Sequence, residues 1–223
     1  MTTSSNRSST VGIVTTVWSY EEYLPGWCKS IRALERQPDK VVVAAHNAEN
    51  VVSIMASELP QAIVVPVEEE FTLAHYLNKA VEVCDTDWVG WIGADDRYRP
   101  TAFNGIDECK SDIISFGMKY SDNGREWHYG NDLHNCFFYN PVPCGSPFRR
   151  WIWEKIPFQT KLSPFEDWTF WTGAHLLGAS IEGTSGRVDF DYAIHPGQIH
   201  LSQEQGSMLL RKWAEDLRQQ SII

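Results

Sequence analysis

The chain has 223 residues, of which 43% are hydrophobic, enough to bury the core of one domain with a small C-terminal extension. Its formal net charge of −10 argues against a broad electrostatic grip on nucleic acid and leaves only a local basic cleft for such a partner. The longest aliphatic stretches, such as residues 62–67, are far shorter than the roughly 20 apolar residues that cross a bilayer. We therefore expect no membrane insertion and a cytoplasmic protein.

The first ten residues, MTTSSNRSST, contain no apolar segment of the kind found in signal peptides, so we expect residues 1–10 to form a disordered leader. Five cysteines, an odd number without a CxxC pair, are typical of buried thiols in a reducing compartment. Four side chains could in principle hold zinc: His128, His134, Cys136 and Cys144. Their spacing fits no zinc finger or ribbon, which favours a loop with buried thiols.

The first half of the chain alternates between apolar strands and amphipathic helices. Strands are predicted at residues 11–18, 41–45, 62–65 and 88–92. Helices are predicted at residues 21–36, 50–58 and 72–84. Several of these strands are apolar throughout, as in a mostly parallel sheet that helices cover on both faces. Ligands bind beyond the carboxyl ends of such strands, so the residues after 18, 45 and 92 are expected to line one crevice.

The second half of the chain has a different pattern after Pro100. Residues 112–120 and 125–130 flank Asn123-Gly124, a dipeptide typical of a hairpin turn. Helices are predicted near residues 149–155, 164–178 and 203–219, and a strand around 187–194. The fold class is therefore α/β, with a Rossmann-like, mostly parallel central sheet flanked by helices and a smaller mixed region.

The apolar strand at 88–92 is followed closely by two adjacent aspartates, Asp95 and Asp96. Mg²⁺ and Mn²⁺ prefer oxygen ligands and can bridge carboxylates at such a position to a nucleotide diphosphate. The alternative is a turn in which Asp96 caps a following helix. This segment alone leaves both interpretations open.

A second acidic pair is Glu166-Asp167. Ser163, Pro164 and Glu166 match the N-cap, N1 and N3 positions of a capping box, which gives Glu166 a structural role. Asp167 has no such role, and a carboxylate in the first turn is kept ionised by the positive helix end, which suits a general base. The alternative is an ordinary first-turn acid.

His195 precedes Pro-Gly at the expected end of a strand, where its imidazole could complete a metal shell or contact a phosphate. A solvated loop histidine is the alternative. Four tryptophans lie before and after this acidic pair in the sequence: Trp151, Trp153, Trp168 and Trp171. Their indole rings could stack on a ligand, but core packing is expected for at least two of them.

Together these segments resemble the family 2 glycosyltransferases of the GT-A fold from Val11 to about Ser202. The segments that carry the resemblance are VGIVTTVWSYEEYLPGWCKSI, FTLAHYLNKAVEVCDTDWVGWIGADDRYRP with its DxD-like region, FRRWIWEKI, FEDWTFWTGAHLLG and YAIHPGQIHLS. The resemblance implies one GT-A domain over residues 11–202, with a nucleotide-sugar half at 11–100 and an acceptor and catalytic half at 101–202. A C-terminal helix at 203–223 would follow.

The resemblance also implies an inverting transfer without a covalent intermediate, from a UDP-sugar by default, with Mn²⁺ or Mg²⁺ as cofactor. Asp167 would be the base, Asp95 the carboxylate nearest the metal, Asp96 its neighbour, and His195 a metal or diphosphate ligand. The implied donor site comprises Thr16, Val17, Trp18, His46, Asn78, Lys79, Ala94 and Asp95. The implied acceptor side comprises Glu166, Trp168 and Trp151.

Three positions depart from the family pattern. Gly93 stands where the family often has an acid, so metal binding must depend on Asp95, Asp96 and His195. His46 follows Ala44-Ala45 where acids usually contact the base, and Leu77, ahead of Asn78 and Lys79, replaces a common arginine. A non-catalytic sugar-nucleotide-binding protein of the same fold is therefore an alternative function. Nucleotidyl transfer is disfavoured because residues 15–22 contain no glycine-rich loop.

The acceptor is expected to be a glycan, a small molecule or a hydroxymethylated pyrimidine in phage DNA, and the last would place the protein in a host cytoplasm. Arginines that could contact DNA phosphates beside the expected cleft are Arg97, Arg99, Arg149 and Arg150. Aromatic side chains could hold an extruded base. The acidity of the chain counts against DNA.

Overall fold

The computed structural model describes residues 8–68, 72–128, 130, 132–162, 165–194 and 203–219, the last range from 206 onward with side chains. The seven-stranded sheet has the order β10-β6-β9-β4-β1-β2-β3, and a second, four-stranded sheet has the order β5-β11-β7-β8. The strands of the larger sheet are β1 (Val11–Val17), β2 (Lys40–Ala45), β3 (Ile63–Pro66), β4 (Trp88–Trp91), β6 (Ile113–Ser115), β9 (Phe148–Arg149) and β10 (Ile181–Gly183). Those of the smaller sheet are β5 (Arg97–Tyr98), β7 (Gly117–Tyr120), β8 (Glu126–His128) and β11 (Phe190–Tyr192).

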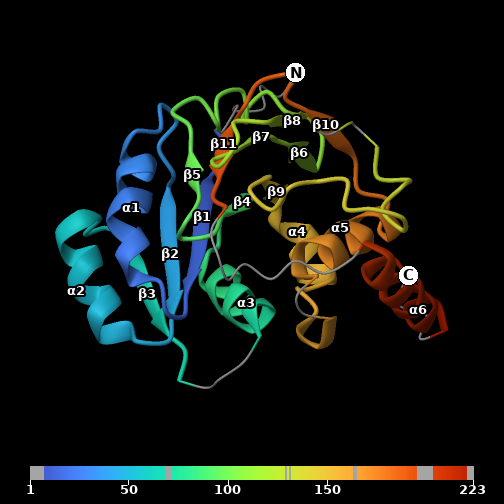
Figure 1. The fold of residues 1–223 in the computed structure, drawn as a ribbon, viewed down its shortest axis with the longest axis horizontal. Helices are drawn as coiled ribbons and strands as arrows, with labels where there is room; N and C mark the ends of the chain where they lie inside the picture. The colour runs from blue at the N-terminus through green and yellow to red at the C-terminus, as the bar shows by residue number, and fades with distance from the viewer. Residues whose placement is uncertain are drawn as a thin grey trace, which may run out of the picture.

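Six α-helices and two short 3-10 helices are described (Figure 1). The α-helices are α1 (Leu24–Arg32), α2 (Ala48–Glu58), α3 (Leu73–Val83), α4 (Arg150–Lys155), α5 (Glu166–Leu176) and α6 (Gln203–Gln219). The 3-10 helices are η1 (Glu21–Tyr23), directly before α1, and η2 (Thr160–Leu162).

The centre of the larger sheet is parallel, as its continuously apolar strands predict. β1 lies between β2 and β4 and runs parallel to both, with Val14 opposite Val42 on one side and Trp91 on the other. Only β9 runs antiparallel to its neighbours, β4 and β6. Because parallel strands end at the same edge, the loops after β1, β2 and β4 lie along one side of the sheet.

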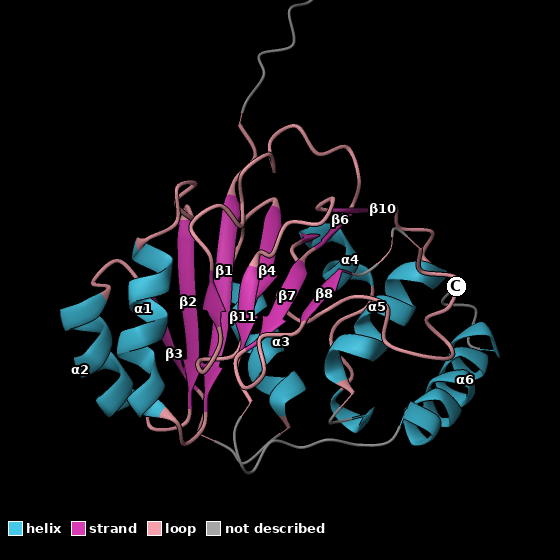
Figure 2. Cartoon of the chain, turned by 45° about the horizontal axis from the view of Figure 1, so that its top comes forward, coloured by secondary structure: helices cyan, strands magenta, loops and turns pink. Residues whose placement is uncertain are grey.

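Helices cover both faces of this sheet because successive strand side chains alternate between two cores. Ile13 and Val43 pack with Trp27 of α1 and Val51 of α2. On the other face, the alternate strand residues Val14 of β1 and Val42 of β2 form a second core with helix side chains. These include Leu77 of α3, Ile152 of α4 and Phe170 of α5. Figure 2 shows α1 and α2 beside β2 and β3, with α5 and α6 at the opposite end of the molecule.

The strand predicted at 112–120 divides at Phe116, so that β6 joins the larger sheet and β7 the smaller one. The backbone N–H of Phe116 donates to Oγ of Ser146 at 3.0 Å, outside either sheet ladder. A β carbon on Gly117 would collide with the carbonyl oxygen of Arg187, so only glycine allows this close approach. The predicted hairpin is confirmed, since β7 and β8 pair antiparallel around Gly124, whose φ is 69°.

The helix predicted at 203–219 is present as α6 and packs against α5 through Leu210, which clusters with Phe165 and Trp168. Gly206 permits this contact, because a β carbon there would lie 2.8 Å from Phe165 and collide with Trp168. In the portion of the chain that the structure describes, no helix has the length and apolar character needed to cross a membrane.

Candidate active site

The loop after β4 carries Asp95 and Asp96. It turns sharply, because the backbone N–H of Asp96 donates to the carbonyl of Gly93 at 3.1 Å. Asp96 is 3% exposed, and its Oδ1 accepts the backbone N–H of Ala193, directly after β11, at 2.7 Å. The chain continues from Asp96 into strand β5, so the alternative in which Asp96 caps a helix is wrong. Asp96 instead joins the acidic loop to the second sheet.

Burial is the main reason that the pKa of Asp96 lies well above its usual value, and the negative charge of Asp95 raises it further. The backbone N–H of Ala193 and the charge of Arg97 oppose this rise only in part. Two carboxylates held together at the end of a buried strand repel one another, and a bound cation would relieve that repulsion.

The space beside Gly93 lies between these two carboxylates. A β carbon on Gly93 would collide with Oδ1 of Asp95 and lie 3.2 Å from Oδ2 of Asp96. Two carboxylate oxygens therefore border one small space, and Mg²⁺ is typically held by one or two carboxylates together with substrate phosphates and water. The carboxylates of Asp95 and Asp96 are suitable ligands for such a cation. Within the described residues, however, no cluster of three or more metal-ligating side chains occurs.

Arg97 fixes the shape of the acidic loop. Its guanidinium donates to the carbonyl of Ala94 at 2.8 Å, of Asp96 at 2.6 Å and of Tyr23 at 3.1 Å. Gly26 of α1 leaves room for this group, since a β carbon on Gly26 would lie 2.5 Å from Nη2 of Arg97. Arg97 thereby ties the loop to the start of α1 and places a positive charge beside the two aspartates.

Asp167 lies in the first turn of α5, as predicted. Its Oδ1 accepts a hydrogen bond from the backbone N–H of Trp168 at 2.7 Å. Its Oδ2 accepts a hydrogen bond from the side-chain amide Nδ2 of Asn140, also at 2.7 Å. Burial raises the pKa of Asp167 above its usual value, and the two hydrogen bonds oppose the rise. A raised pKa suits a carboxylate that must accept a proton.

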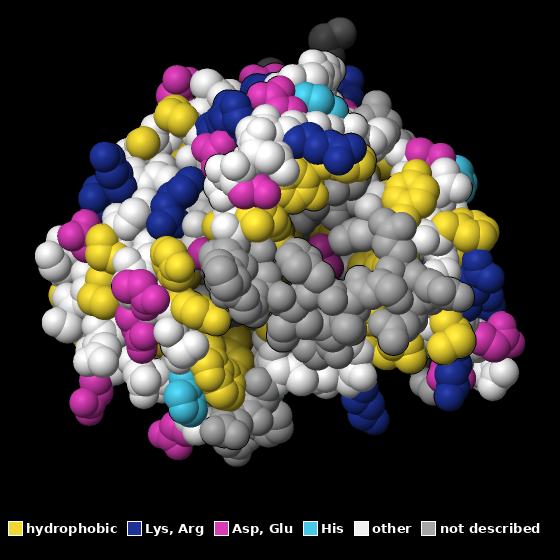
Figure 3. All heavy atoms as spheres, viewed as in Figure 1, with side chains coloured by type: hydrophobic (Ala, Val, Ile, Leu, Met, Phe, Trp, Pro, Cys, Tyr) yellow, Lys and Arg dark blue, Asp and Glu magenta, His cyan; other side chains and the backbone are white. Residues whose placement is uncertain are grey.

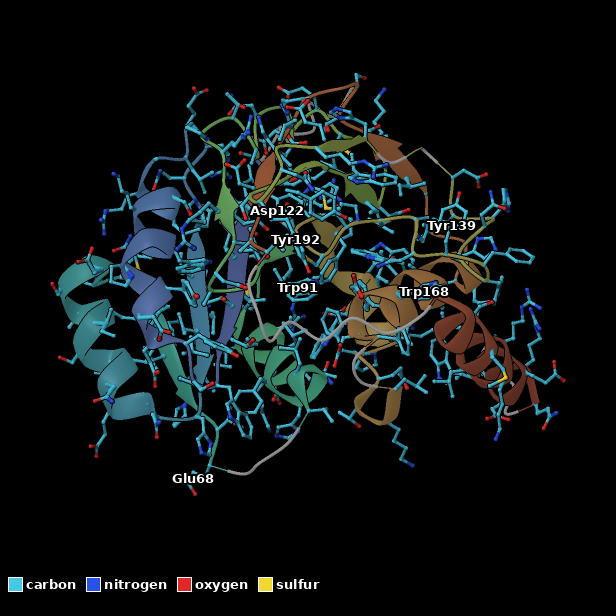
Figure 4. All side chains as sticks on the ribbon, viewed as in Figure 1. Glu68, Trp91, Asp122, Tyr139, Trp168 and Tyr192 are labelled. Atoms are coloured by element: carbon cyan, nitrogen blue, oxygen red, sulfur yellow. The ribbon has the colours of Figure 1, made fainter. Side chains whose placement is uncertain are left out.

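One cavity of about 370 Å³ joins the two acidic sites. Its lining residues are Leu73, Trp91, Gly93, Asp95, Asp96, Met118, Tyr120, Asn140, Pro143, Cys144, Glu166, Asp167 and Tyr192. The strand-end carboxylates therefore face the carboxylates of α5 across a shared space. Figure 4 shows Trp91, the last residue of β4, and Tyr192, the last residue of β11, near the middle of the molecule.

The sequence model for "Glycosyl transferase family 2" matches residues 12–166, which is more than half of the chain. The chain belongs to glycosyltransferase family 2. No curated protein sequence matches it.

Several solved structures share the fold of this family 2 chain at low sequence identity. S. aureus TarS 1–349 in complex with UDP-GlcNAc has a TM-score of 0.73 and 18% identity over 90% of this chain and 65% of that one. A second structure of S. aureus TarS 1–349 has a TM-score of 0.68 and 19% identity over 82% of this chain and 60% of that one. The chain thus spans less than two thirds of either TarS fragment.

A further structure with this fold is the mannosyltransferase PcManGT from Pyrobaculum calidifontis, in complex with GDP-Man and Mn²⁺. Its TM-score is 0.66, with 16% identity over 86% of this chain and 59% of that one. At these identities the structures establish the GT-A fold of this family 2 chain, and its site residues must be judged from its own geometry.

Glu166 differs from its prediction. Residues Ser163 and Pro164 lie outside the described residues, and the described N-cap is Phe165, so Glu166 is the first helical residue and not N3 of a capping box. The carbonyl of Phe165 accepts the N–H of Thr169 at 2.8 Å, as expected of an N-cap. Glu166 is 3% exposed and lines the cavity, so it belongs with Asp167 in the site.

The carboxyl ends of β1 and β2 carry four predicted donor-site residues: Thr16, Val17, Trp18 and His46. Trp18 is 41% exposed and stacks on His46, with the ring centroids 4.9 Å apart and the planes 9° apart. Nδ1 of His46 lies 3.2 Å from the hydroxyl of Tyr76 in α3. Leu73, one turn earlier in α3, lines the cavity, whereas Thr16, Val17, Trp18 and His46 do not.

Two predicted donor-site residues in α3 point elsewhere. The amide of Asn78 accepts from the backbone N–H of Phe158 at 3.0 Å and from Nε1 of Trp153 at 2.8 Å, and it donates to the carbonyl of Phe158 at 2.9 Å. It therefore anchors the segment after α4. Lys79 is half exposed beside Glu82, 3.7 Å away. Neither residue lines the cavity, whereas Ala94 lies within the acidic loop itself.

The two predicted acceptor-side tryptophans pack outside the cavity. Nε1 of Trp151 donates to Oδ1 of Asp112 at 3.0 Å, which directs the indole toward the β6 end of the sheet. Trp168 is 4% exposed and donates to the carbonyl of Cys136 while packing against α6. Figure 4 shows Trp168 on α5 beside α6. Both indoles thus pack against core clusters, and neither lines the cavity.

The arginines considered for DNA phosphates are engaged within the chain. Their contacts are Arg97 with Asp96 O, Arg99 with Asp191 Oδ1, Arg149 with the Trp88 ring and Arg150 with Cys84 O. None of them lines the cavity. On the face in Figure 3, Lys and Arg are interspersed with Asp and Glu and form no basic band.

His195 lies outside the described residues, so its predicted part in a metal shell is not placed. Of the zinc alternative, Cys136 is buried and Cys144 lines the cavity, and neither belongs to a metal-ligating cluster among the described residues. Burial keeps the pKa of the Cys144 thiol well above its usual value, so this thiol is protonated and a poor nucleophile.

The sequence interpretation missed several residues that line the cavity. Tyr120 of β7 and Tyr192 of β11 pack edge to face, with centroids 5.8 Å apart, and form an aromatic wall. Asn140 comes from the loop between β8 and β9. The alternation of β7 and β11 could have indicated inward-facing tyrosines, but no periodic signal marks a single asparagine in an irregular loop.

Proposed function

We propose that this family 2 chain transfers a sugar from a nucleotide-sugar donor to an acceptor hydroxyl with inversion at the anomeric carbon. The observation that carries the proposal is the single cavity that Asp95 and Asp96 share with Asp167 and Glu166. An inverting transfer needs a site for the departing diphosphate and a base on the opposite side of the sugar. Carboxylates at two sides of one cavity meet both needs.

In the proposed reaction, Asp167 accepts the proton of the acceptor hydroxyl. The freed oxygen forms a bond to the anomeric carbon as the bond from that carbon to the diphosphate oxygen breaks, and its electron pair leaves with the nucleoside diphosphate. Asp95 and Asp96 would hold a divalent cation, which when bound would supply positive charge to the departing diphosphate. Arg97 keeps the loop that bears these aspartates in position.

We assign the nucleoside to the aromatic edge formed by Trp18 and His46. Trp18 presents an exposed ring there, and an indole face can stack on a base. A UDP-sugar is the first donor to test, because TarS 1–349 binds UDP-GlcNAc. Mn²⁺ is the first cation, because PcManGT was found with GDP-Man and Mn²⁺.

We further propose one catalytic domain over residues 11–202. The cavity is lined from both of its halves, by Asp95 of residues 11–100 and by Asp167 of residues 101–202. For the acceptor we favour a small molecule or the end of a glycan over hydroxymethylated DNA. The four arginines considered for phosphate contacts are already engaged, and the chain is acidic.

A panel of nucleotide sugars tests this function, with Mn²⁺, Mg²⁺ or a chelator. The correct donor should raise the melting temperature only with the cation, because a ligand that binds the folded state stabilises it, by about 2.7 kcal/mol at one hundred times its Kd. Nucleoside diphosphate release should then depend on an acceptor. A donor that binds without any transfer across a broad acceptor panel would favour the non-catalytic alternative, and no binding in any combination would refute the proposal.

A further inference from the structure

Asn140 and Asp167 both line the cavity, and the side-chain amide of Asn140 contacts the carboxylate of Asp167. Its Nδ2 lies 2.7 Å from Oδ2 of Asp167, a distance typical of a hydrogen bond to an ionised acceptor. From this contact we propose that Asn140 is a positioning residue, which orients the Asp167 carboxylate for proton transfer and favours its ionised form. This inference rests on the proposed function for the role of Asp167 as base.

Both oxygens of the Asp167 carboxylate are held, each by a different element. Oδ1 accepts the backbone N–H of Trp168 in α5, and Oδ2 accepts the amide of Asn140 in the loop between β8 and β9. A carboxylate oxygen can accept two hydrogen bonds, so each oxygen keeps a lone pair for an incoming hydroxyl. Two donors from two directions fix the rotation of the carboxyl group.

The loop that carries Asn140 is itself fixed from outside the cavity. The carbonyl of Cys136 accepts the indole N–H of Trp168, and the carbonyl of Phe137 accepts the hydroxyl of Ser207 in α6. Cys136 is fully buried. These contacts hold the loop against α5 and α6 at Cys136 and Phe137, a few residues before Asn140.

The other end of the Asn140 amide is not satisfied. Oδ1 of Asn140 is buried and has no hydrogen-bond partner among the residues that the structure describes. Turning the amide by half a rotation would bring this acceptor against Oδ2 of Asp167, so the observed orientation is the one that pairs with an ionised base. An unpaired buried acceptor opposes folding, so stability alone does not explain this asparagine.

The titratable groups that line the cavity with Asp167 are Asp95, Asp96, Tyr120, Cys144, Glu166 and Tyr192. Burial is the main influence on the pKa of Asp167 and raises it, while the hydrogen bond from Asn140 lowers it. Removal of the amide donor should therefore raise this pKa further. It should also let the carboxyl group rotate.

The test compares Asn140→Ala with Asn135→Ala, the same change at an exposed position of the same loop. In Asn140→Ala the acid limb of the pH dependence of transfer should move upward by about one unit, since a hydrogen bond to a charged group has roughly that effect. The kcat should fall at least about tenfold, while the KM for the donor stays within about twofold. Asn135→Ala should match the parent.

A second measurement does not require turnover. Carboxyl carbon NMR of ¹³C-labelled aspartate follows the titration of Asp167, whose resonance is assigned by its loss in Asp167→Asn. Its midpoint should rise in Asn140→Ala and in Asn140→Leu, which keeps the side-chain volume without a donor. An unchanged midpoint in both variants, or an equal shift in Asn135→Ala, would overturn the inference. Absence of transfer in the parent with a shifted midpoint would refute the proposed function and leave the Asn140–Asp167 coupling standing.

Discussion

Gly93 and Asp95 share one small space at the end of β4, because a β carbon on Gly93 would collide with Oδ1 of Asp95. Gly93→Ala should therefore turn the Asp95 carboxyl away from Asp96. The free energy of unfolding should change by less than about 1 kcal/mol, since only the end of a side chain must move. Cation-dependent donor binding should weaken at least about tenfold, measured by titration calorimetry.

Gly130→Ala is the matched control for Gly93→Ala, because a β carbon at Gly130 meets no atom of the described residues within 4 Å. It should leave donor binding unchanged. Parent-like, cation-dependent binding by Gly93→Ala would show that the position of the Asp95 carboxyl does not matter to the cation.

Asp167→Asn should keep donor binding and lose transfer by roughly 10²- to 10⁴-fold, the usual contribution of a general base. Glu166→Gln is the neighbouring comparison in the same cavity, and it should retain more activity because Asp167 is the proposed base. Rates with saturating donor and acceptor distinguish the two variants. If Glu166→Gln were the inactive one and Asp167→Asn the active one, the base would be Glu166.

The stability of Asp167→Asn should exceed that of the parent near neutral pH. Burial raises the pKa of Asp167 in the folded protein above its ordinary value of 3.8. Between these two values the folded chain binds more protons than the unfolded chain, so the parent loses stability as pH rises through that window. Asp167→Asn has no such loss.

The melting-temperature advantage of Asp167→Asn should therefore shrink as pH falls and vanish below about pH 3.8, where both states of the parent are protonated. Thermal scans between pH 3.5 and 8 without added cation measure it. An advantage that stays constant over this range would show that Asp167 titrates alike in the folded and unfolded protein.

Arg97→Lys keeps the positive charge beside the acidic loop but removes the planar group that reaches three backbone carbonyls. The free energy of unfolding should fall by about 2 kcal/mol, as expected for lost hydrogen bonds to a charged group. Cation-dependent donor binding should also weaken. Denaturant unfolding and calorimetry measure the two effects, and parent-like behaviour would mean that the charge alone is sufficient.

Trp18→Ala should weaken nucleotide-sugar binding about tenfold, because base stacking on an aromatic ring contributes about 1 to 3 kcal/mol. Trp127→Ala is a close control, since Trp127 is 38% exposed and Trp18 is 41% exposed. The two variants are compared by calorimetry with the same donor. Equal affinities of both variants and the parent for the donor would rule out nucleoside binding at the aromatic edge.

The sequence by itself determined the parallel half of the fold. Strands such as β1 and β2 are mostly apolar and are buried at every position but one, and a strand buried on both faces requires helices above and below it. The sequence also predicted a helix at residues 203–219, which is α6 in the structure. Because ligands meet the carboxyl ends of such strands, the sequence also indicated that Asp95 would lie at a binding site.

Short strands could not be recognised in the same way. β5, β9 and β10 contain only two or three residues each, which is too few to show an alternating pattern. One predicted strand divides at Phe116 between two sheets, and the carbonyl of Arg187, far along the chain, closely approaches the next residue, Gly117. Long-range contacts of this kind are decided by packing.

The difference between what the sequence predicted and what the tertiary structure decided is largest at the candidate active site. Local sequence pattern singled out Asp95 and Asp167, since each is an acid at the start or end of an apolar element. The capping pattern assigned Glu166 a structural role, whereas the structure buries it in the cavity, because the described helix begins at Glu166 itself. Tertiary structure alone brought Asn140 to Asp167, since a hydrogen bond between an irregular loop and a helix leaves no periodic trace in the chain.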